Sequence, residues 1–161
     1  MPEKEKLIDL INTMLKRPGE DESKYTEIKE ELQGKDDIPS EVVVHITNVL
    51  SNYDTNVLPK VFNLIDYLTG KCSEKLSKLL KSEDFFEKLS FLIYEPIYKT
   101  KILSLVKYWS LMYDSQLSNY PHLRELITTL KSYEIDLPTN PILLYCEKNW
   151  SGDSKPQHAT Q

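Results

Sequence analysis

The segments PSEVVVHITNVL (39–50), VLPKVFNLIDYLT (57–69) and EDFFEKLSFLI (83–93) decide the fold class of this chain. In each of them apolar residues recur every three or four positions, which is typical of an amphipathic helix. The polar turn NYDTN (52–56) and the segment GKCS (70–73) separate the three patterns. Because these connections are short, the succession predicts consecutive helices packed against one another.

The middle segment, residues 57–69, is apolar around most of its circumference. A helix of this kind is covered on several sides, so we expect it at the centre of the fold. Pro59 is compatible with this helix only in its first turn, where a missing N–H leaves no intrahelical bond unmade.

Further helices are predicted on both sides of these segments. Similar periodicities and breaks predict helices over 4–16, from Ser23 to near Gly34, over 74–80, over 98–113, and after Tyr120-Pro121. The result is an all-α domain of about eight helices over residues 4–138. We expect residues 139–150 to form an extension in which 142–150 dock as a short helix. The polar residues 151–161 are predicted to be a disordered tail.

Composition narrows the classes of function. The chain has 161 residues and a formal net charge of −5. An acidic surplus argues against direct binding of nucleic acid, because phosphates are held by Lys and Arg. Cys72 and Cys146 match no zinc spacing and predict reduced thiols in the cytoplasm. The sequence contains no signal peptide and no apolar run of about 18 residues, so we expect no membrane span.

Nothing in the sequence resembles catalytic machinery. The three histidines, His45, His122 and His158, lie in no HExxH pattern, and no GxSxG, GxGxxG or P-loop motif occurs. We therefore expect a protein that is not an enzyme, with no metal site and no cofactor.

The order of several motifs resembles the VHS domain, a helical module of vesicle-coat and endosomal sorting adaptors. PSEVVVHITNVL is similar to the third helix of that family, and Asn56-Val57 to the pair that opens its fourth. Lys71 and Ser73 replace the Asn and Gly that usually flank the family's Cys, here Cys72. The other matching segments are NLIDYLTGKCS (63–73), Phe85, Phe86 and Leu89, KTKILSLVKYWS (99–110) with Trp109, and LKSYEIDLP (130–138).

This resemblance implies a right-handed superhelix and a monomeric adaptor that recognises ubiquitin or short peptide signals of cargo proteins. It implies a cytoplasmic protein at endosomes, the Golgi or endocytic sites of the plasma membrane, which reaches membranes through its partners. Fungal actin-patch proteins, which link endocytosis to the actin cytoskeleton, also contain such domains.

Two sites follow from the same resemblance. VHS domains commonly bind ubiquitin through an exposed Trp on the second helix, and Tyr25, followed by Ile28 and Lys29, falls at the comparable place. An amphipathic aromatic residue can serve as an interface anchor. The alternative is that Tyr25 packs at the start of its helix. A VHS subclass binds acidic dileucine signals between its sixth and eighth helices. Glu83 and Glu87 fall there and repel an acidic peptide, so a basic or phosphate-free peptide is more compatible.

Two relatives of the same superhelical fold remain as alternatives. The ENTH and ANTH domains bind phosphoinositides through basic clusters near the N-terminus, whereas here acidic residues interrupt the lysines. Domains that read the RNA polymerase II tail have an Asp in the central helix, which Asp66 resembles. A phosphate pocket formed by Lys60, Lys71, Lys101 and Lys107 would favour that second reading.

Overall fold

The computed structural model describes residues 3–17 and 22–146. These residues contain eight α-helices and two 3-10 helices and no strand, so the predicted all-α class is confirmed. The chain divides into two compact units, Met1–Leu79 and Leu80–Gln161. The predicted domain over residues 4–138 spans both units, and the handedness of a superhelix over them stays a prediction.

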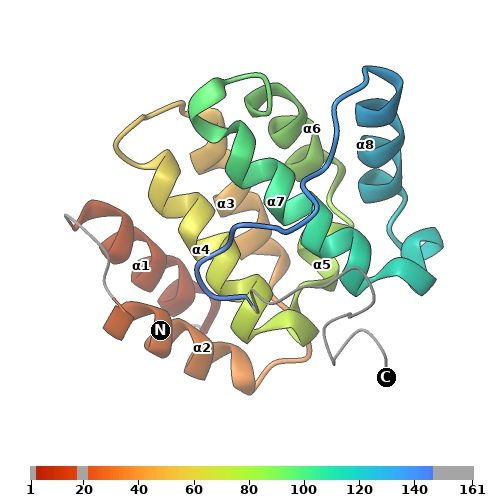
Figure 1. The fold of residues 1–161 in the computed structure, drawn as a ribbon. Helices are drawn as coiled ribbons and strands as arrows, with labels where there is room; N and C mark the ends of the chain where they lie inside the picture. The colour runs from red at the N-terminus through yellow and green to blue at the C-terminus, as the bar shows by residue number, and fades with distance from the viewer. Residues whose placement is uncertain (1–2, 18–21, 147–161) are drawn as a thin grey trace. The chain divides into compact units, whose positions relative to one another are not determined.

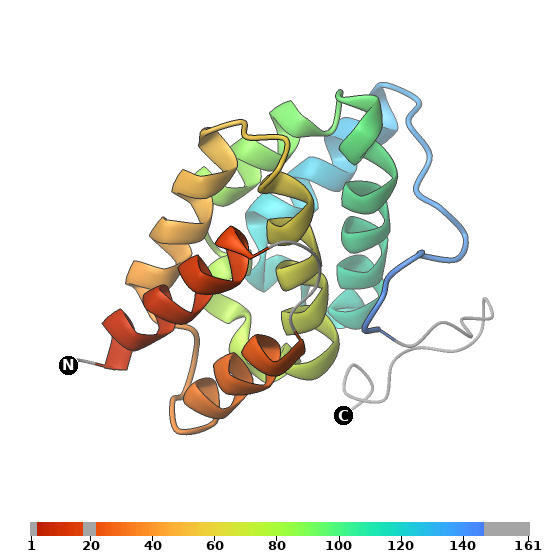
Figure 2. The same cartoon turned by 90° about the vertical axis from the view of Figure 1, so that its left-hand side faces the viewer.

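The first unit contains α1 (Glu3–Lys16), α2 (Glu22–Gln33), α3 (Ser40–Ser51), α4 (Leu58–Lys71) and the 3-10 helix η1 (Ser73–Lys75). α1 packs against α2 and α3, and α4 packs against α2 and α3 (Figures 1 and 2). Pro59 lies in the first turn of α4, as the sequence requires. Nine residues of α4 are buried, which confirms that this helix belongs to the core.

Polar contacts fix the connections of this unit. The backbone N–H of Ile38 donates to the carbonyl oxygen of Lys75 at 3.0 Å, and the Lys75 ammonium donates to the carbonyl oxygen of Lys35. His45 Nε2 lies 2.7 Å from Asn12 Oδ1 and joins α3 to α1. Two hydrogen bonds with Lys75 therefore hold the loop between α2 and α3, and burial of the Ile38 side chain holds it further.

The second unit contains α6 (Glu83–Leu92), α7 (Pro96–Met112), the 3-10 helix η2 (Asp114–Asn119) and α8 (Pro121–Ser132); the short α5 (Ser77–Leu80) precedes them. α6, α7 and α8 contact one another in pairs. Trp109 is fully buried, and its ring centroid lies 6.2 Å from that of Phe85 and 6.0 Å from that of Phe86. This aromatic cluster is the centre of the unit.

The chain after α8 differs from the prediction. Residues 142–146 are not helical, whereas we predicted a short helix over 142–150. They nevertheless dock: the N–H of Ile142 donates to Ser104 Oγ at 3.0 Å, and Leu143 and Cys146 are buried, so the segment lies over α7 (Figure 1). The apolar pattern of this segment therefore reflects the burial of Leu143 and Cys146 in a non-helical chain, and not the apolar face of a helix. Trp150 and the predicted tail lie outside the described residues.

Candidate functional site

A cleft of about 350 Å³ opens between α6 and α8 of the second unit. Its walls carry four side chains from each helix. The lining residues are Glu83, Phe86, Glu87, Ser90, His122, Glu125, Leu126 and Thr129.

Helical spacing places the α6 wall. Ser82 caps the helix, because its Oγ accepts from the N–H of Phe85 at 3.2 Å. Glu83 and Glu87 are four residues apart and therefore share one face of α6. Phe86 lies on the same side but is only 5% exposed, since its ring packs against Trp109. The α6 wall thus combines two exposed carboxylates with an aromatic floor.

The α8 wall is built in the same way. Pro121 begins the helix at a position where its missing N–H leaves no helical bond unmade. His122, Glu125 and Thr129 follow at spacings of three and four, so they lie on one face. Leu126 beside them is 6% exposed and completes the apolar floor with Phe86.

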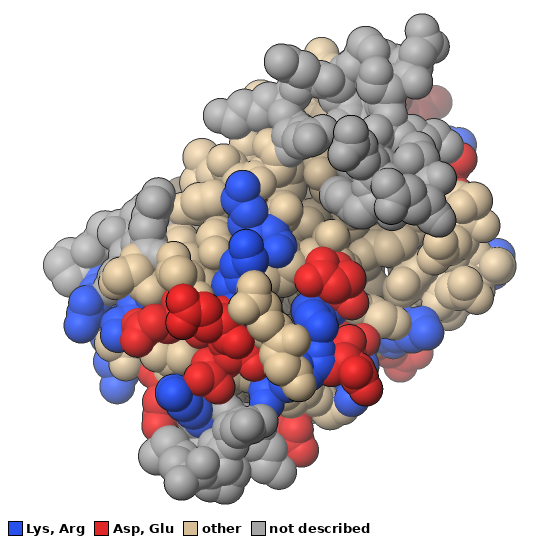
Figure 3. Space-filling view, turned by 90° about the horizontal axis from the view of Figure 1, so that it is seen from below, with Lys and Arg blue, Asp and Glu red and all other residues tan. Residues whose placement is uncertain are grey.

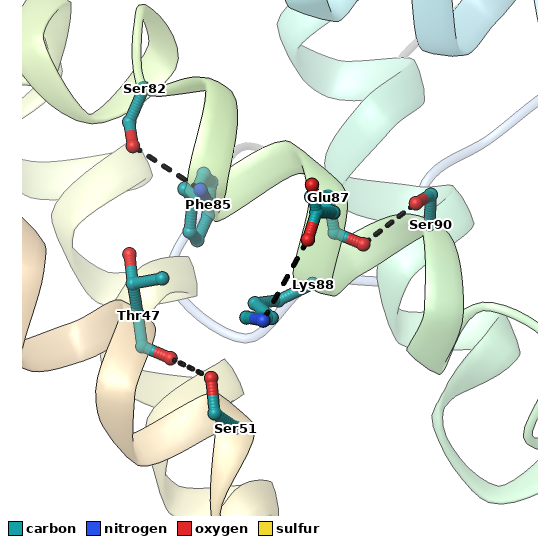
Figure 4. A network of polar contacts seen from close by, with 7 residues as sticks. All are labelled: Thr47, Ser51, Ser82, Phe85, Glu87, Lys88 and Ser90. Carbon is teal, nitrogen blue, oxygen red and sulfur yellow. Dashed lines mark hydrogen bonds and ion pairs between the residues drawn. The ribbon is translucent and has the colours of Figure 1, made fainter.

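The cleft carries a surplus of negative charge. Glu83, Glu87 and Glu125 are all exposed. Lys88 offsets Glu87 only weakly, because Nζ lies 3.9 Å from the carboxylate oxygen (Figure 4). Ser90 Oγ donates to the carbonyl oxygen of Glu87 at 2.7 Å, which leaves the carboxylate itself available (Figure 4). A positively charged ligand with an apolar side chain matches this arrangement.

The structure brings both predicted groove residues, Glu83 and Glu87, into this cleft. The α8 wall was not predicted from the sequence; it consists of His122, Glu125, Leu126 and Thr129. Their three- and four-residue spacing on an amphipathic helix was a usable signal for a shared face. It could not show that this face meets α6.

The predicted ubiquitin anchor is buried. Tyr25 and Ile28 are each 1% exposed, and the Tyr25 ring stacks on Tyr67 of α4 with centroids 4.7 Å apart and planes at 13°. The expectation that Tyr25 is an exposed anchor is therefore contradicted, because the ring fills the space between α2 and α4. Of the predicted three residues only Lys29 is partly exposed.

The residues of the polymerase-tail alternative belong to different units: Asp66, Lys60 and Lys71 lie on α4, and Lys101 and Lys107 lie on α7. Asp66 is fully buried in α4 and not available to a peptide at the surface. Lys60 and Lys71 are eleven residues apart on the same helix, which separates them by about 16 Å along its axis.

The phosphoinositide alternative needs clustered basic residues, because such clusters bind anionic membranes. On the face in Figure 3, Lys and Arg side chains are instead interspersed with Asp and Glu.

The remaining titratable groups of the described residues bear on thiol and metal-binding chemistry. Burial, reinforced by Glu74, raises the pKa of the Cys72 thiol to about 11, so the thiol stays protonated and is a poor nucleophile or metal ligand. No three His, Cys, Asp or Glu side chains of residues 3–17 and 22–146 gather where they could hold a metal ion. In the same ranges no helix combines the length and apolar character needed to cross a bilayer.

His45 predicts a pH dependence of stability. Burial lowers its pKa below the ordinary value, so the unfolded chain takes up this proton at higher pH than the folded chain. The contribution of neutral His45 to the free energy of unfolding is therefore complete above the unfolded pKa of about 6.5. It declines as the pH falls from there through the lower pKa of the folded chain. Urea unfolding measures the free energy of unfolding at about pH 7.5 and about pH 5.5. Between these two pH values the His45→Gln variant should lose less stability than the wild type. Equal losses would contradict this role.

Comparison of the chain with protein-family models, with curated proteins and with solved structures gives no match. The resemblance to VHS domains therefore stays a prediction, and the function is argued from the cleft.

Proposed function

We propose that the chain is a non-enzymatic interaction module whose α6–α8 cleft binds a short, positively charged peptide. The observation that carries this proposal is the arrangement of three exposed glutamates around the apolar floor of Phe86 and Leu126. Lysine and arginine side chains of the peptide pair with the glutamates, while one apolar side chain contacts the floor. An acidic signal is repelled by the same residues.

Magnitudes favour a weak, salt-sensitive interaction. Three exposed ion pairs contribute roughly 0.6–3 kcal/mol in total. Burial of one aliphatic side chain against the floor adds roughly 1.5–3 kcal/mol. Because the charged part is screened by salt, raising the ionic strength should weaken binding. Weak, reversible contacts of this kind suit an adaptor that hands over its ligand.

The proposed setting rests on the resemblance to VHS domains. In it the chain is a cytoplasmic adaptor in membrane trafficking or endocytosis, at endosomes, the Golgi or endocytic sites linked to actin. Its ligand is the basic segment of a cargo or adaptor protein, and it reaches membranes through that partner.

Charge reversal on both walls tests the proposal. Glu87→Lys with Glu125→Lys should weaken binding of a basic hexapeptide that contains one leucine by roughly 10–100-fold, since attraction at two positions becomes repulsion. Isothermal titration calorimetry measures the change. Glu30→Lys with Glu74→Lys is the matched control, because both residues are exposed, lie outside the cleft and change the net charge equally. Equal weakening by the control pair would show bulk charge rather than a site.

A second candidate, ubiquitin binding, is favoured by a different observation. Phe91, Tyr94 and Ile97 are 67%, 61% and 70% exposed at the turn between α6 and α7. Phe91 lies in the last turn of α6, Tyr94 in the connection and Ile97 in the first turn of α7. Exposed apolar groups close together in the sequence are typical of contact surfaces, and ubiquitin presents an apolar patch. Titration with mono-ubiquitin should perturb the amides of this turn, and Phe91→Ala with Ile97→Ala should abolish the perturbation. Perturbation confined to α2 would contradict this location.

A further inference from the structure

A second cavity, of about 640 Å³, lies in the first unit and has no role in the cleft proposal. Its size is in the range of small-ligand sites. α1, the end of α3 and the start of α4 supply its walls. The lining residues are Asn12, Leu15, Lys16, Val49, Asn52, Asn56, Val57 and Lys60.

Contacts on three sides fix the shape of this cavity. Lys60 Nζ donates to the carbonyl oxygen of Leu15 at 3.3 Å and ties α4 to the end of α1. The side chain of Asn12 is held by His45, whose Nε2 lies 2.7 Å from Asn12 Oδ1. The N–H of Asn56 donates to Asp54 Oδ1 at 2.9 Å and sets the turn that leads into α4. Contacts among α1, α3, α4 and the turn before α4 therefore hold the walls of the cavity in place.

Among the residues that the structure describes, the lining carries two lysines and no carboxylate. Lys16 is exposed and Lys60 half-buried, and neither makes an ion pair with a described residue. Two ammonium groups at one cavity favour an anionic ligand. The three asparagine amides both donate and accept, and three aliphatic side chains complete the wall.

This combination selects between anions. A compact phosphate offers acceptor oxygens and one or two hydroxyl groups but no apolar part, so it leaves the aliphatic walls without a counterpart. The carboxyl end of a peptide offers a carboxylate for the lysines, peptide N–H and C=O groups for the asparagines, and a side chain for Leu15, Val49 and Val57. Each group of the cavity then has a matching group on the ligand.

We propose that this cavity binds the free carboxyl end of a peptide whose last residues are aliphatic. Lys16 and Lys60 hold the carboxylate, the asparagine side chains pair with the last peptide groups, and the aliphatic wall contacts the terminal side chains. The described lining residues of this cavity all belong to the first unit, whereas the α6–α8 cleft belongs to the second.

The test uses the full chain and two pools of acetylated pentapeptides with randomised aliphatic ends, one with free carboxylates and one amidated. Affinity selection should retain members of the first pool only, and the best of them should shift the side-chain amide resonances of Asn12, Asn52 and Asn56. Lys16→Gln with Lys60→Gln should weaken binding about tenfold. Lys99→Gln with Lys131→Gln, a pair outside the cavity, should not weaken it, and circular dichroism should show that both variants are folded.

Three results would overturn the proposal. Equal retention of the amidated pool would exclude a role for the carboxylate. Retention of neither pool would exclude a peptide terminus with aliphatic last residues, which is the proposed ligand. A shift of the asparagine amides by inorganic phosphate or octanoate, with none by the peptides, would assign the cavity to a different anion.

Discussion

Replacing Tyr25 by Ala should lower the free energy of unfolding by about 3–5 kcal/mol, the cost typical of removing a large buried aromatic side chain. The ring is 1% exposed and stacked on Tyr67, so its loss leaves a void between α2 and α4. Urea unfolding followed by circular dichroism measures the change. The sequence left two alternatives open: an exposed anchor whose removal weakens binding and leaves stability nearly unchanged, or a ring that packs at the start of its helix, and the buried ring agrees with the second.

Two variants control for other effects of the substitution. Tyr25→Phe keeps the stacked ring and should cost much less than Tyr25→Ala. Tyr94→Ala removes the same side chain from an exposed position and should change stability by about 0.5 kcal/mol or less. A cost for Tyr25→Ala as small as that for Tyr94→Ala would mean that the ring does not support α2.

Replacing Trp109 by Ala should also cost about 3–5 kcal/mol, here in the second unit. The indole is fully buried against Phe85 and Phe86. Because Phe86 forms part of the cleft floor, the variant should also weaken binding of the basic peptide. Hydrogen exchange should show the largest loss of protection in α6 and α7.

Trp109→Phe retains an aromatic ring at the centre of the cluster and should recover part of both losses. Phe91→Ala removes an aromatic ring that is 67% exposed and should leave stability unchanged within about 0.5 kcal/mol. A cost for Trp109→Ala confined to α8, with α6 fully protected, would contradict the position of this ring in the core.

Local sequence signals were sufficient for most helices. Apolar periodicity located α1, α3, α4 and α6, and proline positions explain why α7 and α8 begin where they do: Pro96 and Pro121 lie at the first helical position of each. The helix predicted over 98–113 therefore begins two residues early. In place of one helix over 74–80, the structure has the two short helices η1 and α5. Leu76 and Leu79 are buried, so the apolar pattern of this segment reflects burial rather than a continuous helix. η2 carries no strong periodic signal and was not predicted.

The candidate site depended on tertiary information that the sequence does not contain. Glu83 and Glu87 were identified through the resemblance to a known groove. Glu125 and His122 were not, because the rotation of α8 about its axis relative to α6 is set by core packing. For Tyr25 the periodic pattern allowed either an exposed or a buried ring. Its partner, Tyr67, is 42 residues away in the chain, so only the packed unit decides between them.

The most direct test of the peptide-binding proposal is a titration of the isotope-labelled chain with two peptides that differ only in charge. One carries lysines around a central leucine and the other carries glutamates at the same positions. The proposal predicts that the lysine peptide alone shifts the amide resonances of Ser90, Leu126 and Thr129, and that salt reduces the effect. Binding of the glutamate peptide in this cleft, or shifts by the lysine peptide only outside it, would contradict the account.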